Sequence, residues 1–367
     1  MTASTPKTMN AWKVRIGETE PIRTKVPIPE PGLGEVLVKL QAMGVCHTDC
    51  TLLTMKPPTP PDWNMDSEFV LGHEGAGEIA KLGSTSSDNL AIGDRVAIHI
   101  IPGCNQSSSC SSCSRGLHRI CRKPGSGNYG ICHDGMYAEY VCVSERACIK
   151  VPEGVTMEQA AISVDAINTA YCAVTATANV QPGETIVIFG LGGLGLSGLQ
   201  IAQHVMKGEG KIIVADRKKQ AIDMAIKYGV AEEDAILVAD GDGRKTVHEV
   251  VAERGIVVDT FVDFTGHPDA IMSAQLCVKD AGLIVMVGLL AETVPFMPIM
   301  MIVRMVTIKG SYNGSTEDLK SGLELLAQGI ITPKITTGSI EDLPKTLKDL
   351  DEGKITGRRV LLPTWKN

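Results

Sequence analysis

The densest group of reactive side chains in the sequence is a run of four cysteines. Cys104, Cys110, Cys113 and Cys121 lie within 18 residues of one another. Thiolates spaced in this way fold a loop around one tetrahedral zinc ion, and a site closed by four thiolates leaves no position for a substrate. We therefore expect a structural zinc site in a lobe of about residues 104–121. Free thiols or disulfides are the alternative, and a reducing compartment disfavours both.

A glycine-rich turn supplies a second candidate site. Gly190, Gly192 and Gly195 have the spacing of a dinucleotide-binding turn, with an apolar run before them and a helical pattern after them. The first glycine allows the tight turn, the second lets the backbone approach a pyrophosphate, and the third lets the helix pack on the strand. The predicted cofactor contacts are Gly190, Gly192, Gly193, Leu194 and Gly195. A turn that serves the fold alone is the alternative.

Asp216 ends the next apolar run, 21 residues after Gly195. A carboxylate at this place accepts hydrogen bonds from the adenosine ribose and repels a 2′-phosphate, so NAD is favoured over NADP. The neighbouring Arg217 weakens this preference.

The elements around these residues change in character along the chain. The first part, to about residue 155, has short strand patterns such as 35–40 and 94–100, which predict an irregular β-rich domain. Further on, apolar runs alternate with helical patterns, which predicts a doubly wound parallel sheet covered on both faces. These runs are residues 185–189, 211–215, 235–238, 260–264, 283–287 and 307–312.

Composition narrows the class of protein further. The 367 residues suggest two domains, and the net charge of −7 disfavours a nucleic-acid partner. No apolar run is long enough to cross a membrane. Residues 1–10 lack the apolar segment of a signal peptide, and the 11 cysteines suit a metal-binding protein of a reducing compartment. We expect a cytoplasmic location and no membrane partner.

Two further segments gain meaning from their order in the chain. Cys46-His47-Thr48-Asp49 and Gly72-His73-Glu74-Gly75-Ala76-Gly77, with Gly83 beyond, precede the cysteine lobe and the glycine turn. A single cysteine or histidine is more often a packing residue than a ligand. The whole series, however, resembles the zinc-containing alcohol dehydrogenases of the medium-chain dehydrogenase/reductase family over nearly the full chain.

This resemblance implies an α/β fold with a GroES-like β-rich catalytic domain (1–160 and 310–367) and a Rossmann NAD-binding domain (161–309). It implies two zinc ions per chain, one catalytic and one structural, together with NAD and a small-molecule alcohol or carbonyl substrate. It also suggests a homo-oligomer, a tetramer in preference to a dimer, formed through edge pairing of the nucleotide-binding sheet.

The resemblance assigns Cys46 and His73 as ligands of the catalytic zinc. Many family members have a cysteine as the third ligand, just before the dinucleotide-binding domain. Asp165 lies at the matching position here, and carboxylate oxygen is a suitable zinc ligand. Cys172 is the second choice for this role.

Other residues near the metal also take roles from the resemblance. Glu74 approaches the metal or tunes it from behind, and Asp49 orients the ligand histidine. Thr48 is the hydroxyl that passes the proton of the alcohol outward, while His47 contacts the pyrophosphate or belongs to the relay. Some members have a histidine at the position of Thr51; a threonine cannot act as a base, so solvent or His47 takes the proton.

The remaining assignments concern cofactor and substrate. Thr169 and Val287 match positions near the nicotinamide. Arg358 matches an arginine that binds the pyrophosphate, with Arg359 as its competitor. Trp63 and Ile100, together with Thr48, match the substrate pocket.

Three alternatives stay open at this stage. A polyol dehydrogenase would need polar pocket walls, which Ile100 and Trp63 do not supply. A zinc-free quinone or enone reductase would not need Cys46, His73 or the cysteine lobe. A non-catalytic NAD-binding protein would need broken metal ligands, and none is visibly broken.

Overall fold

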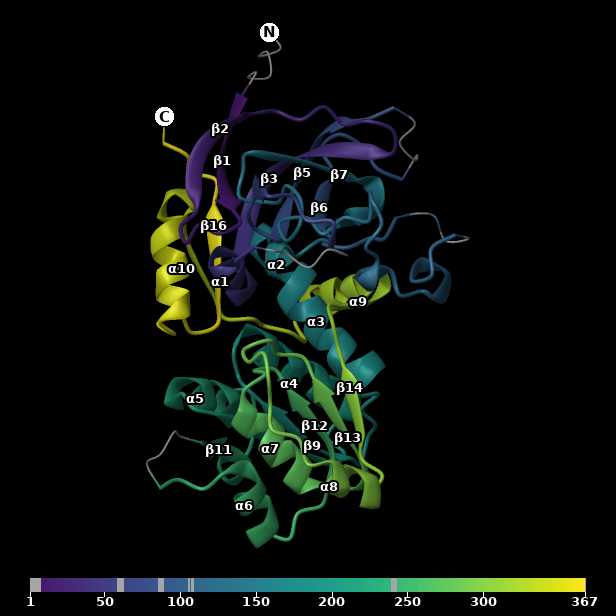
Figure 1. Cartoon of the computed structure of the whole chain (residues 1–367), viewed down its shortest axis with the longest axis vertical. Helices are drawn as coiled ribbons and strands as arrows, with labels where there is room; N and C mark the ends of the chain where they lie inside the picture. Colours follow the sequence, from purple (N-terminus) through teal and green to yellow (C-terminus); the bar gives the residue numbers. More distant parts are fainter. Residues whose placement is uncertain are drawn as a thin grey trace. The chain divides into compact units, whose positions relative to one another are not determined.

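The computed structural model describes residues 8–57, 63–84, 89–104, 106, 109–238 and 243–366. The chain forms two compact units (Figure 1). Unit 1 contains Met1–Asp165, Ser315–Ala327 and Lys334–Asn367, and unit 2 contains Ala166–Gly314 and Gln328–Pro333. Among the described residues, no helix has both the length and the apolar character needed to span a bilayer.

Unit 1 is built on a seven-stranded sheet in which only one strand pair is parallel, β15 with β16. Its strand order is β15-β16-β3-β5-β6-β8, and β7 pairs with β3. The strands are β15 (Ile335–Ser339), β16 (Arg358–Leu362), β3 (Glu35–Val45), β5 (Glu74–Leu82), β6 (Arg95–Ile98), β8 (Cys148–Lys150) and β7 (Tyr140–Ser144). This β-rich unit agrees with the predicted fold class.

The antiparallel strand pair β3 and β5 positions two of the predicted zinc ligands, Cys46 and His73. Gly44, near the end of β3, lies opposite Glu74, the first residue of β5. The Cα atoms of residues directly opposite each other in an antiparallel pair are about 4.5–5.5 Å apart. Cys46 follows β3 and His73 precedes β5, so the register brings both to one end of the same strand pair.

In the described part of unit 1, a second sheet and four α-helices accompany the large sheet. Three strands, β1 (Thr8–Arg15), β2 (Ile22–Pro27) and β4 (Glu68–Val70), form a small antiparallel sheet in the order β2-β1-β4. The helices are α1 (His47–Thr54), α2 (Met157–Ile162), α9 (Thr316–Ala327) and α10 (Leu343–Asp351). Helix α1 packs on α10, where the thiol of Cys50 lies 3.5 Å from the carbonyl oxygen of Leu347.

Unit 2 is a six-stranded parallel sheet with the strand order β11-β10-β9-β12-β13-β14. This is the strand order of dinucleotide-binding Rossmann sheets, so the predicted doubly wound fold is confirmed. The strands are β9 (Thr185–Phe189), β10 (Lys211–Asp216), β11 (Ala235–Leu237), β12 (Val258–Asp263), β13 (Val278–Met286) and β14 (Thr307–Gly310).

The helices of unit 2 cover the faces of this sheet (Figure 1). They include α4 (Gly193–Met206), α5 (Lys219–Lys227), α6 (Val247–Glu253), α7 (Pro268–Cys277) and α8 (Pro298–Val303). The central strands supply the fully buried core residues Val187, Ile213, Phe261 and Ile284. Because both faces are covered, these strands are apolar runs and do not alternate with polar residues.

Two π-helical turns flank the short helix α3 (Asn168–Tyr171). The first, η5 (Ser163–Ile167), continues from α2 and contains Asp165; the second, η6 (Cys172–Thr177), contains Cys172. Such turns are rare and are frequently found at functional sites.

Candidate active site

Three elements of unit 1 bring four side chains together. The ligand atoms of Cys46, His73, Glu74 and Asp165 all lie within 4.8 Å of one another. Asp165 Oδ2 lies 3.4 Å from Cys46 Sγ and 3.9 Å from His73 Nε2. The end of β3, the start of β5 and the π-helical turn η5 therefore meet at one point.

The spacing of these atoms fits a zinc ion. A tetrahedral zinc ion with bonds of about 2.0–2.3 Å holds its ligand atoms about 3.3–3.8 Å apart. Both distances measured from Asp165 Oδ2 are close to this range. The side chain of Asp165 is 16% exposed, whereas that of His73 is 2% exposed, so the group is accessible from the side of the carboxylate.

Asp49, in the first turn of α1, orients His73. Its Oδ1 lies 3.0 Å from His73 Nδ1, which leaves Nε2 to face Asp165. Its Oδ2 accepts hydrogen bonds from the backbone amide of Cys46 at 3.0 Å and from the hydroxyl of Tyr137 at 2.7 Å. Partners of this kind fix the tautomer and the direction of a metal-binding imidazole. Tyr137 is a positioning residue that the sequence analysis missed.

The electrostatics of the group also call for a cation. Burial lowers the pKa of His73, but the nearby carboxylates of Asp49 and Asp165 outweigh burial and raise that pKa well above its usual value. Burial and the negative charge of Asp49 raise the pKa of Tyr137, which keeps its hydroxyl protonated as a donor. The excess of acidic groups is what a divalent ion would compensate.

Glu74 and Arg358 form a buried ion pair beside this group, in which Arg358 Nη2 donates to Glu74 Oε1. Burial raises the pKa of Glu74, and the positive charge of Arg358 opposes that rise. Among the described residues, Glu74 Oε2 has no hydrogen-bond partner, so this oxygen is available to a metal. The role of Arg358 toward a pyrophosphate stays a prediction.

Of the other residues predicted for the site in unit 1, Thr48 lies beside Cys46, and the rest have contacts of their own. Thr48 Oγ1 is 3.8 Å from Cys46 Sγ, and His47 is exposed at the start of α1. The hydroxyl of Thr51 donates to the carbonyl of His47 at 3.2 Å. The ring of Trp63 lies 4.6 Å from the guanidinium carbon of Arg122, and Ile100 is 1% exposed.

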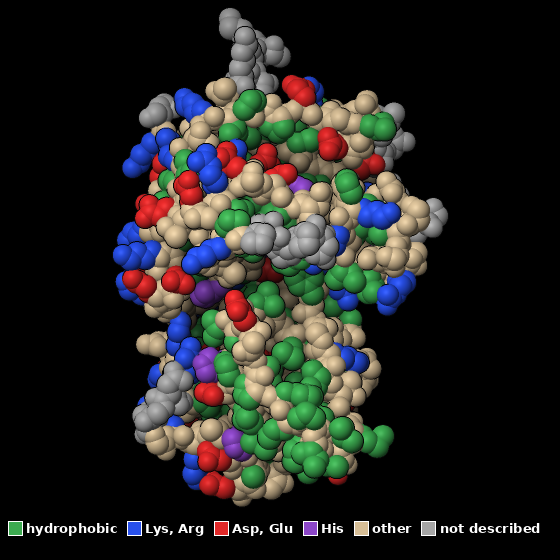
Figure 2. Space-filling view, in the orientation of Figure 1, with side chains coloured by type: hydrophobic (Ala, Val, Ile, Leu, Met, Phe, Trp, Pro, Cys, Tyr) green, Lys and Arg blue, Asp and Glu red, His purple; other side chains and the backbone are tan. Residues whose placement is uncertain are grey.

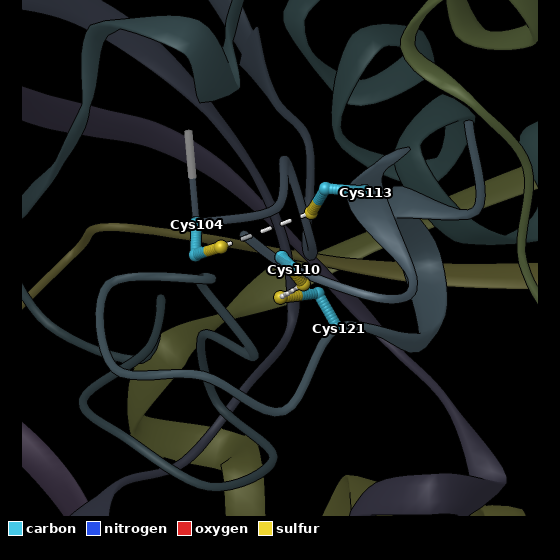
Figure 3. Close-up of side chains that lie close together, drawn as sticks. All are labelled: Cys104, Cys110, Cys113 and Cys121. Carbon is cyan, nitrogen blue, oxygen red and sulfur yellow. Dashed lines mark hydrogen bonds between the residues drawn. The ribbon is translucent and has the colours of Figure 1, made fainter. Parts of the chain in front are cut away.

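The four cysteines of the lobe form a second cluster (Figure 3). Cys104 Sγ lies 3.8 Å from Cys113 Sγ, and Cys110 Sγ lies 3.7 Å from Cys121 Sγ. A disulfide would need about 2.05 Å, and all four thiols are free. Thiolates around one zinc ion, with bonds of about 2.3 Å, stand about 3.8 Å apart, so the cluster fits a closed metal site.

Local backbone geometry supports this lobe. The backbone amides of Cys113 and Ser112 bond to the sulfur of Cys110 and, against the effect of burial, lower the pKa of its thiol to about 6. Gly103 has a φ of +84°, and a Cβ there would stand 2.9 Å from His118 Nδ1 and 3.1 Å from Cys113 Sγ. Only glycine meets both demands without strain.

The glycine turn of unit 2 has the geometry of a cofactor cradle. Gly190 has a φ of +89°, and a Cβ on Gly195 would overlap the carbonyl oxygen of Gly190. Apart from Gly192 and its two chain neighbours, no described atom lies within 4 Å of the place where a Cβ of Gly192 would stand, which leaves room for a pyrophosphate at the start of α4.

Asp216, at the end of β10, is held beside this turn. Its Oδ2 accepts from the amide of Leu191 at 2.6 Å and its Oδ1 from the amide of Lys218 at 2.7 Å. Thr169 and Val287 are buried in the same unit. Cys172, the second choice as a zinc ligand, lies in η6 with its sulfur 3.9 Å from Thr177 Oγ1 and does not belong to the four-residue group around Asp165.

Comparison with known proteins decides the family. Residues 32–153 match the model of the alcohol dehydrogenase GroES-like domain, and residues 193–328 match that of zinc-binding dehydrogenases. An alcohol dehydrogenase of Rhizobium meliloti is 31% identical over 357 residues, which cover 96% of this chain and 98% of that protein. The chain belongs to the alcohol dehydrogenase family. It is therefore an enzyme, an oxidoreductase of the medium-chain dehydrogenase/reductase type.

Other relatives of this family agree over the full length. An alcohol dehydrogenase 1 of Emericella nidulans is 29% identical, covering 92% of this chain and 93% of its own. Among solved structures, the acetophenone reductase of Geotrichum candidum in complex with NAD has a TM-score of 0.85 and 29% identity, covering 98% of this chain and 99% of its own. The alcohol dehydrogenase of Aeropyrum pernix has a TM-score of 0.83 and 26% identity, covering 96% and 100%.

Proposed function

We propose that this enzyme interconverts an alcohol and its aldehyde or ketone by hydride transfer to or from NAD, at a zinc ion held by Cys46, His73 and Asp165. The observation that carries the proposal is the meeting of a thiolate, an imidazole and a carboxylate within 4.8 Å. Three protein ligands leave the fourth position of a tetrahedral zinc ion to a substrate. The four-cysteine cluster would hold a second, structural zinc ion.

The residues around the site have separable tasks. Zinc, when bound, supplies the Lewis acid that lowers the pKa of an alcohol toward neutrality. Cys46 and Asp165 contribute the negative charge that holds a divalent ion, and Asp49 keeps His73 in the tautomer whose Nε2 can bind it. Thr48, 3.8 Å from the sulfur of Cys46, is the hydroxyl that accepts the proton of the alcohol and passes it to solvent or to His47.

The cofactor would be held by unit 2. The open space at Gly192 takes the pyrophosphate, and the amides that begin α4 face its negative charge. The carboxylate of Asp216 binds the adenosine ribose and repels a 2′-phosphate, so NAD is preferred. The NAD complex of the Geotrichum candidum relative supports this preference. The apolar residues Trp63 and Ile100 favour an apolar alcohol or ketone over a polyhydroxylated sugar alcohol.

Two measurements test the proposal together. Elemental analysis of the purified enzyme is expected to find two zinc ions per chain. A panel of alcohols and ketones, followed by the absorbance of NADH, is expected to show turnover that a chelator abolishes and added zinc restores. A fully active preparation without zinc would contradict the proposal, and so would turnover with NADP in preference to NAD.

We also infer that the enzyme is a homo-oligomer, a tetramer in preference to a dimer. β14 is one of the two edge strands of the sheet of unit 2, and all four of its residues are exposed. Beside it, Ile299, Ile302, Val303 and Met305 are 68–77% exposed, and apolar side chains gather over this part of unit 2 in Figure 2. Such a face marks an interaction site. Light scattering is expected to give four chain masses, and Ile302→Lys is expected to lower that mass.

A further inference from the structure

Unit 1 contains a cavity of about 610 Å³ that none of the four metal-ligand residues lines. It is lined by β15, β16, α10 and the turn that follows α10. Six charged side chains line it, four basic and two acidic, which leaves a net charge of +2: Lys334, Lys345, Lys354, Arg359, Asp342 and Asp349. A cavity with excess positive charge attracts small anions.

Strand β16 separates this cavity from the metal centre. Successive side chains of a strand point to opposite faces of its sheet. Arg358 is buried and paired with Glu74, whereas the next residue, Arg359, lines the cavity. The guanidinium of Arg359 lies against the α-carbon of Gly338 in β15, where a Cβ would overlap it. The absence of a side chain at Gly338 therefore leaves the space that the guanidinium of Arg359 fills. Arg358 contacts Glu74, whereas Arg359 contacts Gly338.

The positive charges in the cavity are only partly compensated. Asp349 pairs with Lys345 at 2.5 Å and lies 3.8 Å from Lys354, whose closer partner is Glu352. These lysines and Arg359 hold the pKa of Asp349 below its usual value, Lys345 having the largest effect. Among the described residues, neither Lys334 nor Arg359 has a carboxylate within 4.0 Å, so both are available to an external anion.

We propose that this cavity binds a small phosphate monoester. The planar fork of Arg359 matches two phosphate oxygens, and Lys334 adds a second charge. Thr356 lines the same cavity and supplies a hydroxyl donor, whereas the hydroxyl of Thr336 donates to the carbonyl of Arg358. The volume lies within the roughly 300–1,000 Å³ of small-molecule sites. A phosphate ion is only a few times larger than a water molecule of about 30 Å³, so the cavity has room for an organic group as well.

Calorimetric titration of the whole enzyme tests this site. The probes are inorganic phosphate and glycerol 3-phosphate, at constant ionic strength and with saturating NADH, which occupies the glycine turn. We expect one saturable site per chain, with glycerol 3-phosphate bound more tightly than phosphate. The double variant Lys334→Gln/Arg359→Gln is expected to weaken both at least about tenfold. The control Arg15→Gln removes an exposed guanidinium elsewhere in unit 1 and is expected to change neither.

A variant that is expected to tighten anion binding separates an effect on the site from damage to the fold. Asp349→Asn removes the carboxylate that pairs with Lys345 and is expected to tighten binding, whereas damage to the fold would weaken it. Thermal midpoints of all variants are measured alongside. The proposal is overturned if the wild type shows no saturable site, or if the double variant binds as the wild type does. Competition between NADH and phosphate would also overturn it and assign Arg359 to the cofactor.

Discussion

The two metal-ligand clusters of unit 1 are built in opposite ways. The four-cysteine cluster uses four identical ligands from one short segment, and all of them are buried. The cluster around Asp165 uses a sulfur, a nitrogen and a carboxylate, and 119 residues separate Cys46 from Asp165. One of its ligands is partly exposed. The first cluster depends on its own loop, and the second depends on the whole unit being folded.

This difference separates structural from catalytic use of a metal. A loop that closes around an ion with four thiolates gains folding free energy and leaves no open coordination position. A group assembled from β3, β5 and η5 needs a folded scaffold first, and it keeps an accessible side. We expect changes in the first cluster to alter stability and changes in the second to alter turnover.

The largest effect is expected from Asp165→Ala. Loss of the carboxylate removes one of three ligands. A bound Lewis acid lowers the barrier by several kcal/mol, so its loss is expected to lower kcat/KM about 10³-fold or more. NADH fluorescence and circular dichroism are expected to stay as in the wild type. Asp351→Ala, an exposed carboxylate at the end of α10, serves as the control. Wild-type turnover by Asp165→Ala would remove this residue from the site.

Cys110→Ser removes one of the four sulfur ligands of the four-cysteine cluster. We expect the zinc content to fall from two ions to one, and the thermal midpoint to fall by about 5–10 °C, because the bound ion contributes to folding. Cys142→Ser, outside both clusters, is the matched control. The comparison fails if Cys110→Ser keeps both its zinc and its thermal midpoint while losing turnover.

A smaller effect is expected when the support of a ligand is changed. Tyr137→Phe removes a 2.7 Å hydrogen bond to Asp49, which orients His73. Such partners contribute about 10–100-fold to metal affinity, and we expect about tenfold here. Competition with a chelator, followed by the release of zinc, is the measurement. One of the two ions should leave more readily, and equal retention of both would show that the hydroxyl does not support the site.

The smallest effect on the metals is expected from Asp216→Ser in unit 2. This change removes the carboxylate at the end of β10, so the preference for NAD over NADP is expected to fall about tenfold, with both zinc ions retained. Steady-state kinetics with the two cofactors measures it. An unchanged preference would show that another residue selects the cofactor.

Much of the fold could be predicted because its signals are local. The glycine turn, the strand before it and Asp216 lie within 32 residues, and the apolar runs of a covered sheet stand out from their surroundings. The small sheet of β1, β2 and β4 was missed, because β2 has no buried residue and β4 has only three residues. The spacing of the four cysteines was enough to predict that they form one cluster.

The candidate catalytic centre could not be derived from local patterns. Asp165 was selected by family resemblance alone, since nothing around it signals a π-helical turn or a contact with Cys46. Tyr137 is a single aromatic residue outside any strand or helix, and its bond to Asp49 spans 88 residues. The ion pair of Arg358 with Glu74 spans 284 residues. Contacts of this length depend on sheet register, which becomes visible only in the folded unit.

Gly72, which precedes His73, and two glycines of a second segment limit how this sequence can vary. Gly72 lies against the ring of Tyr137, and a Cβ on either Gly130 or Gly135 would overlap the carbonyl of Gly72. The two segments lie so close together that an added methyl group would displace the backbone that carries His73. In a systematic mutational scan, these uncharged positions should therefore be as intolerant as the ligands themselves, although none of them can hold an ion or a substrate.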